Sequence, residues 1–289
     1  MVDYTQIGTC NQDIDANECL LYRDPGVKIP LIANDARAVV LSHGAQVVSW
    51  IAGDAEQLYL SPDADFREGQ AIRGGIPVCF PQFDQRGTLP KHGFARNREW
   101  RVVSQSEGAV ALELTHDDDT QRIWPHQFRA RIVVVLERNA LDVRLEVENR
   151  GSAPFEFTGA LHTYLRVGDR AAAHLDGLAG VGYLDHRSGS SSNDAQGALP
   201  IEAIGRTYRT PALTLALVEG RRRVDIDSRG FENVVVWNPG TATVFTDLPP
   251  DGWREFLCVE AAQVTQAIEV GAGQRWVGGQ RLRLSTMTT

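Results

Sequence analysis

Three ionisable side chains lie among apolar neighbours and could exchange protons with a substrate. Glu260 follows the apolar run FLCV and precedes two alanines, so few local charges can pair with it. Burial at such a position raises the pKa of a carboxyl group and suits it to act as a general base. His162 lies in the apolar stretch GALHTYLRV, and His92 lies in KHGFAR beside cationic residues. General acid–base chemistry by these three residues is the first hypothesis.

Each of these residues also has a structural interpretation. Glu260 could face solvent from its strand, and a histidine inside an apolar strand is more often a hydrogen-bonded structural residue. Two histidines and a glutamate are also a possible zinc set, but HExxH spacing is absent and the neighbouring cations would repel a metal. We expect no metal. The serine nucleophile motif GxSxG and a Walker loop are missing as well.

Cationic residues surround His92 in the segment 72–100, IRGGIPVCFPQFDQRGTLPKHGFARNREW. Its glycines and prolines interrupt every helical or strand period, so we predict a long irregular loop held by its own apolar side chains. Arg73, Lys91 and Arg96 offer several donors to an anionic ligand. The alternative is that these cations are solvated residues of the loop.

The candidate catalytic and ligand-binding residues must be positioned mainly by strands. The stretch LDVRLEVEN alternates apolar and charged residues from Leu141 on, which is typical of a half-buried antiparallel strand. We predict one long strand over 155–167, which carries His162, and strand structure on both sides of Glu260. Many short strands with almost no helical period indicate an all-β fold, a β-sandwich.

The remaining local predictions concern turns and short segments. Residues 56–60 and 243–246 are predicted as strands, and 62–70 as one short helical turn. Asp117–Asp119 could cap another helical turn that ends at Pro125. Residues 188–197, SGSSSNDAQG, are predicted to form a polar loop that is mobile or acts as a lid.

Length and composition restrict the class of protein. The chain has 289 residues, of which 43% are hydrophobic, and a net charge of −8. We predict a single domain over 1–289 with a core from about residue 27 to 285. A nucleic-acid binder would carry a basic surplus, and no run of 18 apolar residues could span a membrane. The four cysteines form no CxxC pair, so we expect reduced thiols, and without a signal peptide we expect a cytoplasmic protein.

Several motifs together resemble one known family. They run in order from Ile72 to Ala262 and cover well over half of the chain: IRGGIPVCFPQF, LPKHGFARNREW, WPHQFRARI, LDVRLEVENRGSAPFEFTGALHTYLRVGD, GLAGVGYLD, VVWNPG and FLCVEAA. The sequence resembles the hexose-6-phosphate 1-epimerases, also called D-hexose-6-phosphate mutarotases, of the galactose mutarotase-like superfamily. The resemblance implies a β-supersandwich of antiparallel sheets, with few short helices and a sugar site in a concave groove.

The resemblance also implies catalytic roles. Glu260 matches the general base that takes the proton from the anomeric O1 hydroxyl, and His162 matches the general acid that protonates the ring oxygen O5. Ring opening, rotation about the C1–C2 bond and reclosure then interconvert the α and β anomers. His92 matches a second histidine that orients the sugar. This chemistry requires no cofactor.

The same resemblance implies a ligand for the cationic residues of the loop. Arg73 and Arg96 match the arginines that hold the phosphate of the substrate, and Lys91 falls where relatives place another polar contact. The implied partner is a small hexose 6-phosphate, with neither nucleic acid nor membrane. A monomer suffices for such a pocket.

One departure from the family pattern leaves alternatives open. Relatives often carry an aspartate that contacts sugar hydroxyls where this chain has Gly205, in EAIGRTYRTP. Glu202 is a nearby carboxylate that could substitute for it. The alternatives are an aldose 1-epimerase that acts on free sugars and a non-catalytic, regulatory sugar-phosphate-binding protein.

Overall fold

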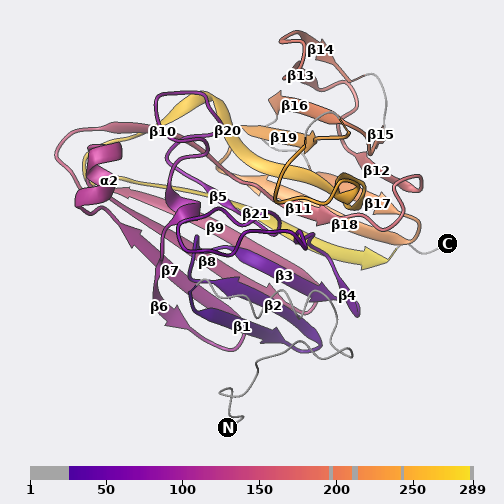
Figure 1. Cartoon of the computed structure of the whole chain (residues 1–289), viewed down its shortest axis with the longest axis horizontal. Helices are drawn as coiled ribbons and strands as arrows, with labels where there is room; N and C mark the ends of the chain where they lie inside the picture. Colours follow the sequence, from indigo (N-terminus) through magenta and orange to yellow (C-terminus); the bar gives the residue numbers. More distant parts are fainter. Residues whose placement is uncertain (1–25, 195–197, 210–213, 242–243, 287–289) are drawn as a thin grey trace.

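The described residues form three antiparallel sheets (Figure 1). A computed structural model describes residues 26–194, 198–209, 214–241 and 244–286 of the chain. The four-stranded sheet has the spatial order β1 (Lys28–Ala33), β2 (Ala36–Leu41), β3 (Val47–Ala52), β4 (Ala55–Glu56). The nine-stranded sheet has the order β15 (Ala198–Pro200), β12 (Ala173–Asp176), β17 (Thr214–Glu219), β18 (Arg222–Arg229), β21 (Arg275–Thr286), β9 (Ala140–Asn149), β8 (Phe128–Glu137), β7 (Ala109–Thr115), β6 (Arg101–Gln105).

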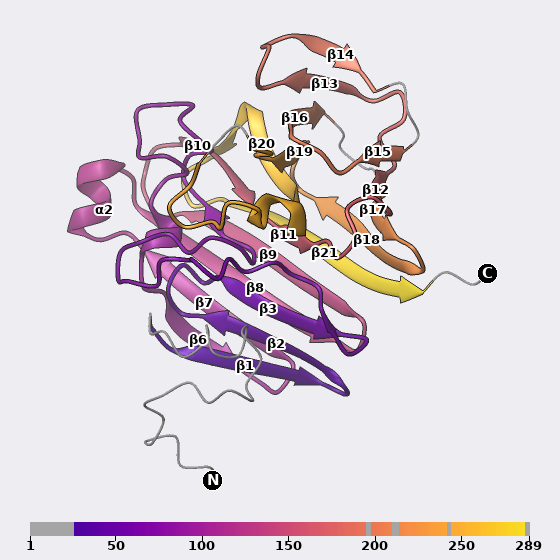
Figure 2. The same cartoon turned by 45° about the vertical axis from the view of Figure 1, so that its right-hand side comes forward.

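The eight-stranded sheet is the one that positions the catalytic candidates. Its order is β14 (Ser191–Asn193), β13 (Gly182–Asp185), β16 (Ile204–Arg209), β19 (Asn233–Asn238), β20 (Phe256–Val270), β10 (Phe155–Leu161), β5 (Val78–Cys79), and β11 (Tyr164–Arg166) also pairs with β20. Figure 2 shows the hairpin of β13 and β14 at one end of the molecule, away from β1–β4. The predicted all-β architecture is confirmed.

Alternation along the strands explains how the sheets pack. Every second residue of β8 is buried, and β9 buries Leu141, Val143, Leu145 and Val147, as the alternation predicted. Side chains that point the same way from neighbouring strands then form one apolar face. This face of the nine-stranded sheet packs against the two smaller sheets, whose buried side chains belong to the same core cluster.

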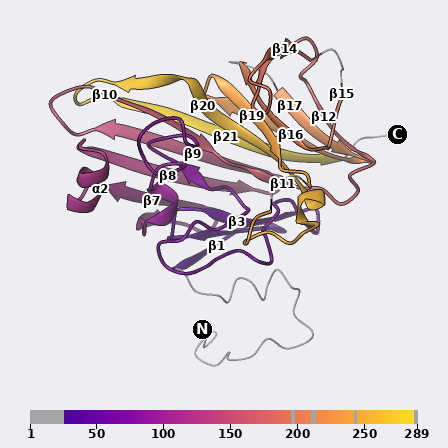
Figure 3. The ribbon, with the colours of Figure 1, turned by 45° about the horizontal axis from the view of Figure 1, so that its top comes forward.

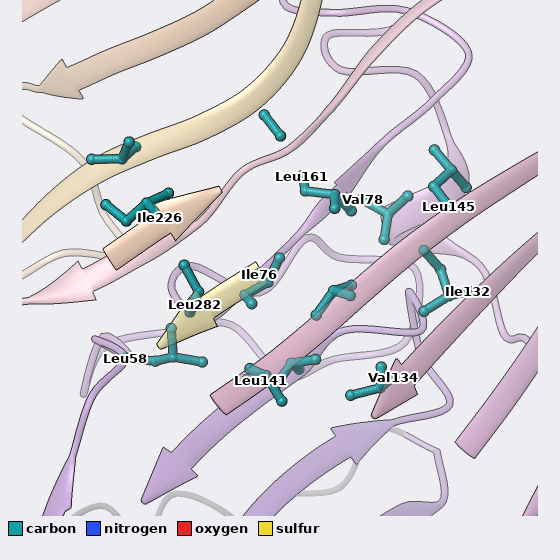
Figure 4. Close-up of a cluster of buried hydrophobic side chains, with 14 of the residues drawn as sticks. Leu58, Ile76, Val78, Ile132, Val134, Leu141, Leu145, Leu161, Ile226 and Leu282 are labelled. Atoms are coloured by element: carbon teal, nitrogen blue, oxygen red, sulfur yellow. The ribbon is translucent and has the colours of Figure 1, made fainter. Parts of the chain in front are cut away.

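The core is therefore a layer of aliphatic and aromatic side chains between sheets. Figure 4 shows Val78 of the eight-stranded sheet beside Leu145 of the nine-stranded sheet. Figure 3 shows the strands in stacked layers, with β1 and β3 in a layer apart from β8 and β9. Burial of this much apolar surface supplies the main driving force for folding.

Within the described part of the chain, helical structure is confined to three short elements. They are α2 (Asp118–Ile123), η1 (Ala95–Asn97) and η2 (Gly252–Glu255). Asp117 caps α2 by accepting a hydrogen bond from the backbone N–H of Thr120, so the predicted cap is confirmed. The prediction of a helical turn over 62–70 is wrong, because that segment contains only turns and bends. None of the described helices has the length and apolar character that a membrane span requires.

The predicted strand over 155–167 is divided in two. β10 ends at Leu161 and β11 begins at Tyr164, while the backbone bends tightly between them, where the N–H of Thr163 donates to the carbonyl of Leu161 at 3.0 Å. The backbone N–H of His162 donates to Pro77 of the irregular loop at 2.9 Å. The continuous apolar pattern concealed this break, because burial continues through both residues.

Three other local predictions need correction. Residues 191–193 of the expected polar loop form β14, while 195–197 lie outside the described residues. Residues 244–246 contain no strand, and Thr243 lies outside the described residues. The strand expected over 56–60 is reduced to β4 and two isolated bridges at Leu58 and Leu60. The buried thiols Cys79 and Cys258 are free, and Cys10 and Cys19 are not among the described residues.

The segment 72–100 is largely irregular, as predicted, and contains only β5 and η1. Its apolar side chains anchor it, with Ile76, Val78, Phe80 and Phe94 all buried in the main core. Gly75 adopts a left-handed φ of 62°, and a Cβ there would lie 2.1 Å from the carbonyl oxygen of Val47. Only glycine allows this approach of the loop to the four-stranded sheet.

Candidate active site

The structure brings all six candidate residues to one cavity. The cavity has a volume of about 730 Å³. Its lining includes Arg73, Lys91, His92, Arg96, His162 and Glu260. A second, larger hollow of about 1130 Å³ shares Lys91 and Arg96 but contains neither His162 nor Glu260. The smaller cavity is therefore the candidate active site, because it contains the His162–Glu260 pair together with the cations.

The register of two strands places His162 opposite Glu260. Leu161 pairs with Ala261, and Tyr164 pairs with Cys258, so the two residues between them on each strand continue the same antiparallel register. Directly opposed residues on such strands have their Cβ atoms about 5 Å apart. The Nε2 atom of His162 lies 3.4 Å from Oε1 of Glu260. The sheet itself thus builds the pair.

Burial sets the protonation of this pair. Glu260 is 1% exposed, and burial, with a smaller contribution from Asp84, raises the pKa of its carboxyl group well above 4.5. Burial also lowers the pKa of His162 to about 3, and the charges of Arg96 and Arg73 act in the same direction. The opposite shifts leave the pair with one proton near neutral pH, since Glu260 stays protonated and His162 stays neutral.

Two polar atoms of the pair have no partner among the described residues. They are Nδ1 of His162 and Oε2 of Glu260, and both are buried. Buried polar atoms in native proteins are nearly always hydrogen-bonded, and exceptions are frequent where a ligand supplies the partner. The two atoms are therefore available to a bound molecule.

His92 is a neutral hydrogen-bond donor. The backbone N–H of Asp84 donates to Nδ1 of His92 at 3.2 Å, so the ring proton of the neutral imidazole lies on Nε2. Burial holds the pKa of His92 far below its ordinary value, with a further contribution from His162. The ring centroids of His92 and His162 are 5.4 Å apart, which places this donor beside the acid–base pair.

The three cations are held in different ways. Nε of Arg73 forms an ion pair with Asp247 at 2.8 Å, and its guanidinium stacks on the ring of Phe245 at 4.4 Å. Nη2 of Arg96 donates to the carbonyl of Lys91 at 3.0 Å, while the buried Nε of Arg96 lacks a hydrogen-bond partner among the described residues. This nitrogen is a donor that an anion in the cavity could use.

Lys91 forms a looser contact. Its Nζ lies 3.4 Å from Oδ1 of Asp84, and its side chain is half exposed. The cavity therefore presents three positive charges against the two carboxylates Asp84 and Asp247 in their immediate contact. This local excess is opposite in sign to the net charge of the chain, −8.

Aromatic side chains complete the walls. Tyr164 stacks on His162 with ring centroids 4.9 Å apart and planes inclined by 13°, and Trp237 meets His162 edge-on at 5.9 Å. These contacts restrain the imidazole ring in one orientation. The motifs LHTYLRV and VVWNPG contain both residues, but neither was predicted to line the site.

Gly205 does lie in the cavity wall, but Glu202 is not among the lining residues. The position of Glu202 therefore does not support the hypothesis that its carboxylate replaces the aspartate found in relatives at position 205. Sequence reasoning also missed Asp84, His186 and Asp247. Asp84 lies in the loop beside Phe83 and had no distinguishing pattern. His186 reaches the cavity after β13, and Asp247 contacts Arg73 without lining the cavity; the sequence did not reveal the path of either segment.

The donor set of the cavity does not resemble a metal site. Within the described ranges, no three His, Cys, Asp or Glu side chains gather closely enough to hold a metal ion. The arrangement places a possible proton donor and acceptor, His162 and Glu260, beside a cluster of cations that can bind an anion.

Comparisons with known proteins give one consistent result. Residues 28–283 match the family model described as aldose 1-epimerase. A protein of Escherichia coli K12 named "Putative glucose-6-phosphate 1-epimerase" is 37% identical over 242 residues, which are 78% of this chain and 80% of that protein. A protein of Cenchrus ciliaris with the same name is 33% identical over 274 residues, 88% of this chain and 83% of that protein.

A solved structure agrees with the sequence comparisons. The crystal structure of a "putative mutarotase" from Salmonella typhimurium superposes with a TM-score of 0.82 at 28% identity, over 90% of both chains. The β-sandwich fold predicted from the sequence is confirmed by this agreement.

Proposed function

The chain belongs to the aldose 1-epimerase family, as the motifs of its sequence implied, and on this premise we propose that it interconverts the α and β anomers of glucose 6-phosphate and related aldohexose 6-phosphates. The observation that carries the proposal is the meeting of the His162–Glu260 pair with Arg73, Lys91 and Arg96 in one cavity. The names of the two relatives support the same substrate class.

Glu260 and His162 would act as base and acid on the same substrate molecule. The carboxylate of Glu260 takes the proton from the O1 hydroxyl, and the imidazolium of His162 gives its proton to O5 as the C1–O5 bond breaks. The product is the open-chain aldehyde, and after rotation about C1–C2 the reverse transfers close the ring on the other face. The pair holds one proton before and after ring opening. The raised pKa of Glu260 and the lowered pKa of His162 favour this proton on Glu260, so it must move to His162 when the substrate binds, before O5 can be protonated.

The substrate phosphate would bind at the cations and also assist the acid. Arg96 and Arg73 lower the pKa of His162 by their charges. A phosphate that neutralises them removes this effect, so the pKa of His162 rises, while burial, the largest cause of its low value, remains. Binding and catalysis are thus coupled through the charge of the ligand, and a phosphorylated sugar activates the acid that it needs.

The test is the rate of exchange between the anomers of glucose 6-phosphate, measured by NMR magnetisation transfer. Wild-type protein should accelerate exchange far above the spontaneous rate. Glu260→Gln and His162→Ala should each reduce the enzymatic rate by about 10²–10⁴-fold, because each removes one proton-transfer group. Glu269→Gln, on the exposed part of β20, is the matched control and should leave the rate unchanged.

The phosphate contact needs its own variant. Arg96→Ala should raise KM for glucose 6-phosphate, whereas Arg98→Ala should not, because Arg98 lines the other hollow and lies 3.6 Å from Asp119. Wild-type exchange no faster than the spontaneous rate for any hexose phosphate would contradict the proposed function.

A second candidate function is epimerisation of unphosphorylated aldoses. The observation in its favour is that Arg73 and Lys91 already contact Asp247 and Asp84 without any ligand. Exchange rates for glucose and galactose beside glucose 6-phosphate separate the two candidates. Faster enzymatic exchange of the free sugars would make the cations structural.

A further inference from the structure

The cavity contains a carboxylate that the proposed mechanism does not use. Asp84 lines the cavity, and its side chain is 44% exposed there. Its backbone has a left-handed φ of 49°, which asparagine and aspartate tolerate better than most residues. Two hydrogen bonds to His92 fix this conformation, because the N–H of Asp84 donates to the ring and the carbonyl of Asp84 accepts from the backbone N–H of His92 at 3.0 Å. The carboxylate is thus presented from a rigid base.

The imidazole of His186 reaches the same cavity from the segment that follows β13. His186 follows β13, and its backbone N–H donates to the carbonyl of Gly205 at 2.7 Å. Its Nε2 lies 2.6 Å from the hydroxyl of Thr207, so the ring extends along β16. A Cβ on Gly205 would lie 3.4 Å from Cβ of His186 and 3.6 Å from its Nδ1. The imidazole occupies the space that a longer side chain at 205 would fill.

The covalent structure of a hexose 6-phosphate divides the ligand into two edges. The phosphate-bearing C6, C5, the ring oxygen and C1 follow one another along one edge, whereas the hydroxyls of C2, C3 and C4 lie on the other. If the cations and the His162–Glu260 pair bind the first edge, the second edge must meet polar groups elsewhere in the wall. Burying hydroxyls without partners is costly. Asp84 and His186 are two polar groups of the wall that can serve this task, because both line the cavity and the proposed mechanism uses neither.

We infer that Asp84 and His186 bind the hydroxyls of C2, C3 and C4 and so determine which hexose phosphate is accepted, an inference that rests on the proposed function. A carboxylate accepts hydrogen bonds from two neighbouring hydroxyls, and the ring nitrogen Nδ1 of His186 offers one further contact. Gly205 contributes by leaving room for the imidazole. Specificity is then set by two segments outside the catalytic strands.

Asp84 also contacts Lys91. This contact suggests a second role for Asp84, which would change KM in the opposite direction, and the test must distinguish the two roles. If Asp84 only neutralises Lys91, its negative charge repels the substrate phosphate, and Asp84→Asn should lower KM. If Asp84 accepts hydrogen bonds from sugar hydroxyls, Asp84→Asn should raise KM. The sign of the change distinguishes the two roles, and asparagine preserves the left-handed backbone.

The experiment measures kcat/KM by anomer exchange for glucose 6-phosphate, its C2 epimer mannose 6-phosphate, its C4 epimer galactose 6-phosphate and 2-deoxyglucose 6-phosphate. Asp84→Asn and His186→Ala should each raise KM for glucose 6-phosphate about tenfold with little change in kcat. Each should also alter the ratio of kcat/KM between glucose 6-phosphate and at least one of the other three by about tenfold. A merely structural role would lower all four values together.

Controls keep the result interpretable. Asp54→Asn changes an aspartate with a similar φ of 61° in the β3–β4 turn, and His174→Ala changes a histidine outside the cavity; both should behave as wild type. Gly205→Val should displace the imidazole and reproduce the effect of His186→Ala. Thermal unfolding of each variant shows whether it is folded.

The outcomes separate the two proposals. Unchanged ratios in Asp84→Asn, or a lower KM, overturn the role of Asp84, and unchanged ratios in His186→Ala overturn that of His186. In both cases the wild-type activity stands and only the specificity inference fails. Wild-type protein that accelerates no exchange contradicts the proposed function itself.

Discussion

At the scale of single residues, the proton shared by His162 and Glu260 is the central property. Burial disfavours a charge on either side chain, and the two pKa values move apart as a result. A carboxyl that stays protonated beside an imidazole that stays neutral costs stability wherever the unfolded chain would prefer the other forms. The same burial that suits the pair to catalysis therefore leaves a signature in the pH dependence of folding.

Glu260→Gln should change that signature above pH about 6.5. There the unfolded wild-type chain has lost the protons of both side chains, whose ordinary pKa values are 4.5 and 6.5, while the folded pair keeps one. Unfolding releases this proton, so wild-type stability falls as pH rises. The variant lacks the carboxyl, and its free energy of unfolding should gain up to about 1.4 kcal/mol per pH unit relative to wild type.

Below pH about 6.5 the comparison reverses. His162 is protonated in the unfolded variant but neutral in the folded variant, so the stability of the variant decreases as pH decreases. The wild-type pair holds one proton in both the folded and the unfolded state down to about pH 4.5, so its stability changes little over this range. Urea denaturation from pH 5 to 9 measures both limbs. Glu269→Gln should follow wild type, and parallel curves for Glu260→Gln and wild type would show that the pair does not share a proton.

The sequence predicted some residues of this site better than others. Glu260 and His162 could be selected because a charged residue in an apolar run is chemically conspicuous, and Arg73 and Arg96 because cations accumulate in one loop. Asp84 and His186 could not be selected, since their importance depends on which turns of the chain meet in space. Local sequence patterns do not show which turns lie close together in space. The position of His186 in the cavity depends on the pairing of β13 with β16, which only the structure shows.

At the scale of elements, the separation of β10 from β11 was the informative error of the sequence analysis. Periodicity predicts where a strand is buried, but both residues of the break are buried too, so the pattern passes through it. The alternating strands β8 and β9 were predicted well because their period of two has no interruption. The break is bridged by side chains: the hydroxyl of Thr163 donates to Oε1 of Gln280 at 2.6 Å, and Nε2 of Gln280 donates to the carbonyl of Val259 at 3.0 Å.

Thr163→Val should expose the importance of this bridge. The variant keeps the shape of the side chain but leaves Oε1 of Gln280 buried without its donor, which should lower the free energy of unfolding by about 1–3 kcal/mol. Thr163→Ser retains the hydroxyl and is the control. Urea denaturation of both variants measures the difference, and equal stability of the two would mean that water or another group replaces the lost donor.

At the scale of the whole molecule, the described strands are joined by pairings between distant parts of the chain. β21 lies between β9 and β18 in the nine-stranded sheet, although these strands are far earlier in the sequence. It pairs with β9 along nine residues and with β18 along eight. A strand near one end of the described chain is thus an interior strand of the largest sheet.

A deletion that begins at Arg275 should therefore abolish folding rather than shorten one edge. It leaves the facing edges of β9 and β18 without their hydrogen-bond partner and removes the core side chain of Leu282. Far-UV circular dichroism and solubility measure the outcome. A two-residue insertion at Gly220, whose Cβ position has no heavy atom within 4 Å, is the control and should be tolerated. A soluble, cooperatively unfolding deletion variant would contradict the expectation.

The interior position of β21 also matters while the protein is being synthesised. A ribosome releases β9 and β18 long before β21, so both strands emerge with an unpaired edge and wait for a partner that has not yet been translated. Glu260 arrives on β20 only shortly before that partner. The nascent chain is consequently open to wrong strand pairing until β21 has closed the sheet, and we expect it to depend on chaperones during that time.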